Sequence, residues 1–235
     1  MGYNAVQFAA QEWELVMAES ESTEMYLKTI LELEDDAQEP VAISRIAERL
    51  GVSAVSANEM VKRLAERNMV VHTPYKGVEF TELGRRRGLS VLRRHRLWEC
   101  FLVQHLDVAW ENSHDLACQL EHATADEVTE RLAIFLGQPV VCPHGSMIPD
   151  ADGHYVEPPT TPLSEMEVGM TGTVRRIYRE ETPLLEYLAD RHVLLGKTVS
   201  VLDIAPYNGP LTVQIEDDEV VLGREIAARI LITLE

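Results

Sequence analysis

The 235-residue chain is 46% hydrophobic and carries 39 acidic against 21 basic side chains, a formal net charge of −18. This length and composition suit two or three small globular domains, and no apolar run approaches the roughly 20 residues that span a bilayer. The three cysteines, Cys100, Cys118 and Cys142, are too few and odd in number for a disulfide framework. We therefore expect a cytoplasmic protein with no membrane partner.

The basic side chains are concentrated in one segment. Residues 44–96 hold 12 Lys and Arg against 5 Asp and Glu, net +7, whereas the rest of the chain holds 9 against 34, net −25. Because binding to phosphates requires clustered positive charge, this segment is the candidate for contact with double-stranded DNA.

The first predicted helix begins near residue 22. Residues 1–21 include a short apolar stretch without obvious caps, and we treat them as an N-terminal extension of no assigned function. From Ser22, STEMYLKTILELE has apolar residues at helical spacing, with Ser22 or Thr23 as the N-cap. From the residues alone, Met25 in this helix is an ordinary core residue.

Residues 41–81 have the pattern of a winged helix-turn-helix. Ser44 is expected to cap the first helix, Gly51 to end it with a positive φ, and Ser53 to cap the second helix. Two β-rich runs around a Pro-Tyr-Lys-Gly turn then form the wing. An ordinary helical hairpin is the alternative from spacing alone, but the wing and the local charge favour DNA binding. The residues of the second helix expected to face inward are Val55, Met60, Val61 and Leu64.

The docking geometry of this motif gives a set of candidate DNA contacts. The N-terminal residues of the second helix reach base edges, and basic residues nearby contact phosphates. The base-edge candidates are Ser53, Ala54, Val55, Ser56, Asn58 and Glu59, and the phosphate candidates are Arg45, Lys62, Arg63 and Lys76.

Side chains that bind metals gather on two predicted helices in the middle of the chain. Packing alone would favour aliphatic residues on such faces, since imidazole, thiol and carboxylate groups are costly to bury unpaired. A divalent first-row transition metal satisfies all of them, and the absence of a CxxC pair argues against a closed structural zinc site. The long helix at 83–109 has His95 and Glu99 at i, i+4, and HDLACQLEH has His114, Cys118, Glu121 and His122 on one helical face.

The C-terminal half is predicted to contain a helix, a linker and a small β-barrel. A helix at about 125–137, with Val128, Leu132 and Phe135 on one face, adds apolar surface that suits a dimer interface. Residues 142–162 are rich in Pro, Gly and Asp, which predicts a linker. Cys142 and His144 in this linker could bind a metal, but we expect them to be ordinary loop residues. About five strands and one short helix follow from Leu163, the pattern of a small barrel.

Several stretches resemble the diphtheria toxin repressor family of iron- and manganese-dependent transcriptional regulators. The resemblance is carried by STEMYL, RIAERLGVS, RRHRLWE and HDLACQLEH, by CPHG followed by IP, and by VGMTGTV, NGPLTVQI and LGREIAARI. It implies a fold that is mainly α-helical and includes some β-structure. The implied parts are a winged helix-turn-helix DNA-binding domain at 22–86, a helical metal-binding and dimerisation domain at 87–141, a linker at 142–162 and an SH3-like small β-barrel at 163–235.

The resemblance also implies two metal sites per chain. The primary site would use Met25, Cys118, Glu121 and His122, and the ancillary site His95, Glu99 and His114. In the family the SH3-like domain adds a Glu and a Gln, but REETP lacks the E-x-x-Q spacing, so Glu180 or Glu181 are the substitutes. Thioether and thiol donors favour Fe(II), with Mn(II) as the alternative. Glu59 stands where the iron-responsive members typically have Gln, which leaves the operator sequence open.

The function implied by the resemblance is repression of metal-uptake genes by a homodimer on a near-palindromic operator, without enzymatic activity. Two other functions fit the residues. One is a metallohydrolase that uses His95, Glu99, His114 and a bound water, although the winged helix counts against it. The other is a metal-independent DNA-binding protein.

Overall fold

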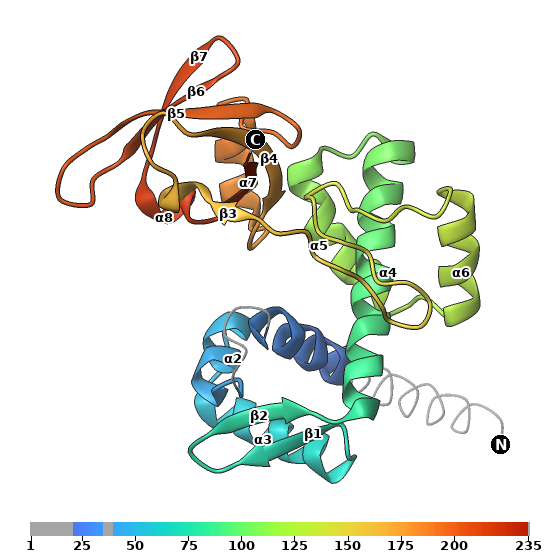
Figure 1. The fold of residues 1–235 in the computed structure, drawn as a ribbon. Helices are drawn as coiled ribbons and strands as arrows, with labels where there is room; N and C mark the ends of the chain where they lie inside the picture. Colours follow the sequence, from blue (N-terminus) through green and yellow to red (C-terminus); the bar gives the residue numbers. More distant parts are fainter. Residues whose placement is uncertain (1–20, 35–39, 235) are drawn as a thin grey trace, which may run out of the picture. The chain divides into compact units, whose positions relative to one another are not determined.

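The structure, a computed structural model, describes residues 21–34 and 40–234 (Figure 1). Most of the predicted N-terminal extension therefore lies outside the described residues. The rest falls into two compact units, one extending to Arg93 and including Ala151–Gly153, the other formed by Arg94–Asp150 and the chain from His154 onward. None of the helices in the described ranges is long and apolar enough to cross a membrane.

The N-terminal unit contains the predicted winged helix-turn-helix. Its buried core includes Ile30, Ile46, Val61 and Val78, which come from the first three helices and the hairpin. The two strands of the hairpin pair antiparallel from Val70 opposite Phe80 to Thr73 opposite Gly77. The elements are a helical stretch over 21–34, α2 (Ile43–Leu50), α3 (Ala54–Glu66), β1 (Val70–Thr73), β2 (Gly77–Phe80) and the N-terminal part of α4 (Glu82–Leu106).

Local sequence signals set the turn between α2 and α3. Gly51 has a φ of 64° and its N–H donates to the carbonyl oxygens of Ala47 and Glu48, as predicted. Ser53 caps α3, with its hydroxyl oxygen 3.1 Å from the backbone nitrogen of Ser56. The predicted cap at Ser44 is wrong, because α2 begins at Ile43 and its N-cap residue, Ala42, makes no side-chain cap.

The inward face of α3 differs in part from the prediction. Val61 and Leu64 are fully buried, and Ala57, which was not predicted, is buried with them. Val55 is 69% exposed, since the first turn of α3 projects beyond the core. Its exposure is compatible with its other predicted role, as a base-edge candidate at the start of the helix.

The C-terminal unit begins with a helical part. The C-terminal part of α4, α5 (Trp110–Glu121) and α6 (Asp126–Phe135) follow one another in the chain. α4 and α6 pack around a core that includes Leu97, Leu132 and, from the loop after α6, Ile148. α4 ends at Leu106, three residues before the predicted end, where Asp107 takes a φ of 52°. Leu132 is buried on α6, but Val128 and Phe135 are 47% and 63% exposed.

A six-stranded antiparallel sheet forms the rest of the C-terminal unit, one strand more than predicted (Figure 1). Register shifts near Val174 and Val201 mark β-bulges, which bend the sheet around its core. The strand order is β3-β8-β4-β5-β6-β7. The elements are β3 (Thr161–Pro162), η1 (Leu163–Glu165), β4 (Thr171–Ile177), α7 (Thr182–Ala189), β5 (Thr198–Ile204), β6 (Leu211–Ile215), β7 (Asp218–Leu222), α8 (Arg224–Ala227) and β8 (Ile230–Leu234).

Candidate metal centre

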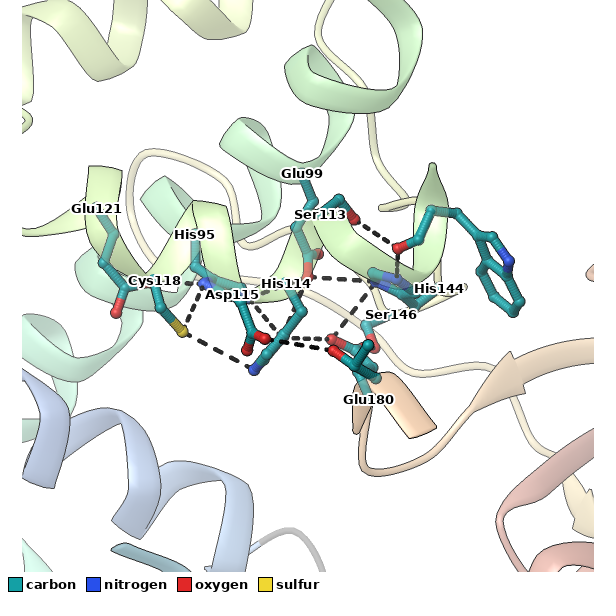
Figure 2. Close-up of polar contacts among 12 residues, drawn as sticks. His95, Glu99, Ser113, His114, Asp115, Cys118, Glu121, His144, Ser146 and Glu180 are labelled. Carbon is teal, nitrogen blue, oxygen red and sulfur yellow. Dashed lines mark hydrogen bonds and ion pairs between the residues drawn. The ribbon is translucent and has the colours of Figure 1, made fainter. Parts of the chain in front are cut away.

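The predicted ancillary residues come together inside the C-terminal unit (Figure 2). His95 and Glu99 lie one turn apart on α4, with His95 Nε2 3.0 Å from Glu99 Oε1. His114, in the second turn of α5, faces this pair, and its Nδ1 lies 3.1 Å from His95 Nε2. The i, i+4 spacing on α4 thus supplies two donors and α5 a third to one place.

Glu180 completes this group, and Glu181 does not. Glu180 precedes α7 and places Oε2 3.4 Å from His114 Nδ1. One ligand atom each from His95, Glu99, His114 and Glu180 lies within 4.8 Å of the other three. Glu181 is exposed and pairs with Arg229 at 3.1 Å, so of the two tentative residues only Glu180 faces the cluster.

His144, predicted to be a loop residue rather than a metal ligand, is fully buried against the same carboxylates. Its Nδ1 lies 3.2 Å from Glu99 Oε1 and 3.5 Å from Glu180 Oε2. Its Nε2 lies 2.9 Å from the carbonyl oxygen of Trp110, to which it must donate. Cys142 is buried beside it and groups with Glu99 and His144 as a further set of potential ligands. Only the Cys-x-His spacing in CPHG hinted at this pair.

The loop that carries His144 is held against the sheet by backbone contacts. The backbone nitrogen of Ile177 in β4 donates to the carbonyl oxygen of His144 at 3.0 Å. Gly145 follows with a φ of +91°, and a Cβ atom there would stand 2.1 Å from the carbonyl oxygen of Arg175. Only glycine permits this close approach, so Gly145 positions His144.

The predicted primary residues of α5 lie on the other side of His95. Glu121 Oε2 is 2.6 Å from His95 Nδ1, and Glu121 Oε1 is 3.2 Å from Nε2 of His122, the C-cap residue of α5. Cys118 Sγ lies 3.9 Å from His95 Nδ1. Met25 is half-buried in the N-terminal unit, and its partnership with these residues stays a prediction.

Burial and neighbouring charges act in opposite directions on the groups of the cluster. Burial opposes ionisation of Glu99, but the imidazoles of His95 and His144 outweigh it and hold the Glu99 pKa well below its ordinary range. Burial likewise disfavours the charged form of His144, and Glu99 and Glu180 outweigh it, raising the pKa of His144 to about 12. The pKa of His114 is also raised, against burial, by Cys118, Glu180 and Glu99. The cluster therefore favours positive charge between its carboxylates.

The donors fit a transition metal ion. Imidazole nitrogens, carboxylate oxygens and a thiol are the set that first-row divalent ions such as Fe(II) and Mn(II) use in proteins. The buried Glu99 Oε2 has no hydrogen-bond partner among the described residues, as expected of an oxygen that has a cation as its partner. We conclude that the side chains present can hold such an ion.

The predicted DNA-contact residues lie at the start of α3 and further along it, in α2 and in the wing. Ser53, Ala54, Val55 and Ser56 are exposed at the start of α3, although Ser53 and Ser56 also bond each other at 2.8 Å between hydroxyl oxygens. Asn58 and Arg45 are half-buried, and the remaining four, Glu59, Lys62, Arg63 and Lys76, are exposed.

The helical part of the C-terminal unit exposes apolar side chains at the end of α4, on α6 and shortly after α6, which we term the α6 patch. Phe135 also contacts the ring of His105 at 4.9 Å between centroids. The α6 patch comprises Leu106, Val128, Ile134, Phe135 and Val140, each at least 47% exposed.

Comparison with known proteins finds family models that match three segments of the chain. Family models match residues 19–78 (iron dependent repressor, N-terminal DNA binding domain), 81–150 (iron dependent repressor, metal binding and dimerisation domain) and 161–234 (FeoA domain). The chain is 33% identical to the diphtheria toxin repressor of Corynebacterium diphtheriae over 193 residues, 78% of this chain and 85% of that protein. It is 37% identical to the iron-dependent repressor IdeR of Mycobacterium tuberculosis over 129 residues, 55% of this chain and just over half, 56%, of that protein.

Solved structures agree over nearly the whole chain. A manganese-dependent transcriptional repressor in complex with manganese superposes with a TM-score of 0.85 at 38% identity, covering 91% of this chain and 100% of the other. The manganese regulator SloR gives a TM-score of 0.77 at 31% identity, covering 91% of this chain and 98% of the other. With a relative at 33% identity matched over 85% of its length, the chain belongs to the diphtheria toxin repressor family of metal-dependent transcriptional repressors.

Proposed function

We propose that this protein is a repressor that binds its operator when Fe(II), or alternatively Mn(II), is bound, and that it controls metal-uptake genes. The observation that carries the proposal is the convergence of His95 and Glu99, both buried, with the partly buried His114 and Glu180, in a chain that also has a winged helix-turn-helix. As a regulator of the chromosome it acts in the cytoplasm and is not an enzyme.

We propose two metal sites per chain. The primary site takes Met25, Cys118, Glu121 and His122, and the ancillary site takes His95, Glu99, His114 and Glu180. The 3.2 Å and 3.5 Å distances of His144 to the two carboxylates support His144, with Cys142, as further donors on the ancillary side. We also propose a DNA-binding domain at 22–86, a metal-binding and dimerisation domain at 87–141 and an SH3-like domain at 163–235, with 1–21 as an extension and 142–162 as the linker.

The identity of the metal is open between two ions. The thiol of Cys118 and the thioether of Met25 favour Fe(II). The names of similar proteins include iron-dependent repressors and manganese-dependent ones, so they support both. Competition of Fe(II) and Mn(II) for the metal-free protein, measured without oxygen, distinguishes them. Tighter binding of Mn(II) would reverse the preference stated here.

The proposed mechanism is linkage between metal and DNA. A bound ion supplies positive charge that draws its donors together, and Met25 belongs to one unit while Cys118, Glu121 and His122 belong to the other. Holding these donors together orders the recognition helix α3 of each protomer, and a homodimer presents two such helices to a near-palindromic operator. Metal and operator then stabilise each other reciprocally, by about 1–3 kcal/mol in typical cases.

The test is selection of operator sequences. The full chain is incubated with random duplex DNA in Fe(II), in Mn(II) and in chelator, and bound sequences are recovered and footprinted. Recovery of a near-palindromic sequence only with metal supports the proposal. Equal recovery in chelator would favour metal-independent DNA binding, and hydrolysis of model esters or phosphoesters by the loaded protein, lost in Glu99→Gln, would favour the hydrolase.

A further inference from the structure

The wing of the N-terminal unit ends in a three-residue turn between Thr73 and Gly77, the last residue pair of β1 and β2. The backbone nitrogen of Lys76 donates to the carbonyl oxygen of Thr73 at 3.1 Å and closes the turn. At the base of the turn, two backbone hydrogen bonds of 2.9 Å join Val41 and Val78, one in each direction. A Cβ atom at Gly77 would stand 2.7 Å from the carbonyl oxygen of Val41, so the backbones are in close contact there. The turn is therefore held at a fixed place in the N-terminal unit.

Tyr75 occupies the apex of this turn. Its relative exposure of 109% is the highest among the large apolar side chains of the described residues. Its φ of 65° lies in the left-handed region, which an L residue adopts at some cost. Single exposed apolar side chains are common on protein surfaces, so the surroundings of Tyr75 decide what its exposure means.

The surroundings of Tyr75 suit a nucleic acid. Residues 72–78 include Lys76 and no Asp or Glu, and they belong to the segment 44–96 of net charge +7. In the N-terminal unit β1 lies beside α3 (Figure 1). Val61 of α3 and Val78 of the wing share one buried core, so the two elements move together. When α3 enters the major groove, the wing beside it meets the sugar-phosphate backbone and the minor groove next to it.

The chemistry of the Tyr75 side chain selects the sugars of that minor groove. The minor groove is about 6 Å wide, which admits a single side chain but not a hairpin. Its walls are deoxyriboses, whose C–H groups pack against an apolar ring, and the phenol hydroxyl can reach a phosphate oxygen or a base acceptor. A tyrosine side chain also loses little conformational entropy on binding, because it has only two side-chain torsions. Lys76, next in the chain, carries the charge that a phosphate needs.

We propose that Tyr75 is a DNA-contacting residue whose ring packs against deoxyriboses of the minor groove next to the major groove that α3 enters. This inference rests on the proposed function, because it takes the role of α3 as recognition helix from it. The width of the minor groove depends on the base sequence, so this contact makes affinity depend on base pairs that α3 does not touch.

The chain offers a matched control in a second turn of the same pattern. Residues 206–209 read Pro-Tyr-Asn-Gly, where 74–77 read Pro-Tyr-Lys-Gly. Tyr207 has a relative exposure of 101% and a φ of 56°, close to the values of Tyr75. It lies in the C-terminal unit and is followed by Asn208 in place of a lysine. Tyr207→Ala therefore removes an equally exposed ring from a similar turn outside the basic segment.

The test uses the full chain, saturating Mn(II) and the operator recovered by sequence selection. Affinity is measured across a salt series for the wild type and for Tyr75→Ala, Tyr75→Phe and Tyr207→Ala. The complexes are then footprinted at saturating protein with two reagents. Hydroxyl radicals cleave at deoxyriboses exposed in the minor groove, and dimethyl sulfate methylates N7 of guanine in the major groove.

Tyr75→Ala is expected to weaken operator binding roughly tenfold, as for an aromatic ring that is buried only in part. The slope of log affinity against log salt should not change, because the lost side chain is uncharged. Tyr75→Phe should stay within about threefold of the wild type, since it keeps the ring and loses one hydrogen bond at most. At saturation, Tyr75→Ala should lose protection of the minor-groove sugars and keep protection of guanine N7.

Three results would overturn the inference: unchanged affinity in Tyr75→Ala, equal weakening in Tyr207→Ala, or retained protection of the minor-groove sugars in Tyr75→Ala. Thermal unfolding verifies that each variant is folded. The same titrations in chelator separate this inference from the proposed function. A wild type that binds the operator equally well in chelator would refute metal control, while the comparison of Tyr75→Ala with Tyr207→Ala would still decide the role of Tyr75.

Discussion

His144 Nδ1 lies 3.2 Å from Glu99 Oε1 and belongs to a ring whose Nε2 is committed to the carbonyl oxygen of Trp110. In the neutral ring the Nδ1 lone pair would face two carboxylates, so without metal the ring holds a second proton there. This explains why the pKa of His144 is raised from 6.5 to about 12 although burial alone would lower it.

The first prediction is that metal binding releases protons. Because the folded-state pKa of His144 is raised, its protonation stabilises the metal-free fold fully below about pH 6.5, and this contribution is lost as the pH rises toward 12. The unfolding temperature of the metal-free protein should therefore fall on the alkaline side, and metal affinity should rise with pH. Calorimetric metal titration in buffers of different ionisation enthalpy counts the protons released on binding. The His144→Ala variant should release fewer protons than the wild type.

The second prediction concerns the primary site. Cys118→Ala, Glu121→Ala and His122→Ala should each abolish metal-stimulated DNA binding, because each removes a proposed primary donor. His95→Ala should weaken it less, since the donors themselves remain. Calorimetric titration of the wild type should count two ions per chain. Wild-type responses in the Glu121 and His122 variants would contradict the assignment.

The third prediction compares two glycines of similar conformation. Gly145 and Gly169 have φ values of +91° and +88°, but a Cβ at Gly145 meets the carbonyl oxygen of Arg175 at 2.1 Å, whereas nothing lies within 4 Å at Gly169. Gly169→Ala should cost only the left-handed strain, about 1–2 kcal/mol. Gly145→Ala should destabilise more and weaken the ancillary metal transition, because the loop carrying His144 must move. Thermal unfolding and Mn(II) titration report the two effects, and equal loss of metal affinity would contradict the positioning role.

Most helices and turns could be predicted from local sequence patterns. Each prediction that was wrong has a cause in the structure near the residue concerned. Gly51 and Ser53 were predicted because the αL conformation and the N-cap each need a specific residue type. Ser44 failed because α2 starts one residue earlier, at Ile43, without a side-chain cap. Val55 failed as a core residue because helical periodicity does not reveal where a helix extends past its neighbours.

The residues of the candidate metal site were likewise predictable only in part. His95 and Glu99 came from spacing within one helix, and spacing is a property of the sequence. The choice between Glu180 and Glu181 was open, since adjacent residues point in different directions and only the packing of the segment before α7 selects Glu180. His144 depends on the bond from Ile177 in a distant strand, which no local pattern encodes.

The fourth prediction is that the α6 patch forms the homodimer interface, most of which lies within residues 95–136. Phe135 and Ile134 are 63% and 66% exposed, and apolar side chains gathered in this way usually contact a partner. Phe135→Asp or Ile134→Asp should give a monomer in sedimentation velocity with Fe(II) or Mn(II). Val156→Asp, at a position 80% exposed outside the patch, is the control and should stay dimeric. A dimer in all three variants would place the interface elsewhere.

The last prediction separates phosphate contacts from base readout. Lys62 and Lys76 are exposed in α3 and in the wing, within the segment of net charge +7, so Lys62→Ala or Lys76→Ala should weaken binding to all sequences alike. Each should also reduce the slope of log affinity against log salt by about one unit, as expected for one lost phosphate contact. Lys197→Ala is the matched control, because Lys197 lies in the C-terminal unit and pairs with Glu216.

Asn58 should behave differently from the lysines. It is half-buried in the second turn of α3, next to the exposed N-terminal residues of the helix, where an amide can pair with an adenine edge. Asn58→Ala should cost about 1–3 kcal/mol on the preferred operator and relax the preference at one base position, with the salt slope unchanged. Binding to the operator and to its single-base variants, measured across a salt series, distinguishes the two kinds of contact. If Asn58→Ala lowers affinity equally for every variant, Asn58 does not read a base, and Ser53 or Ser56 at the start of α3 becomes the better candidate.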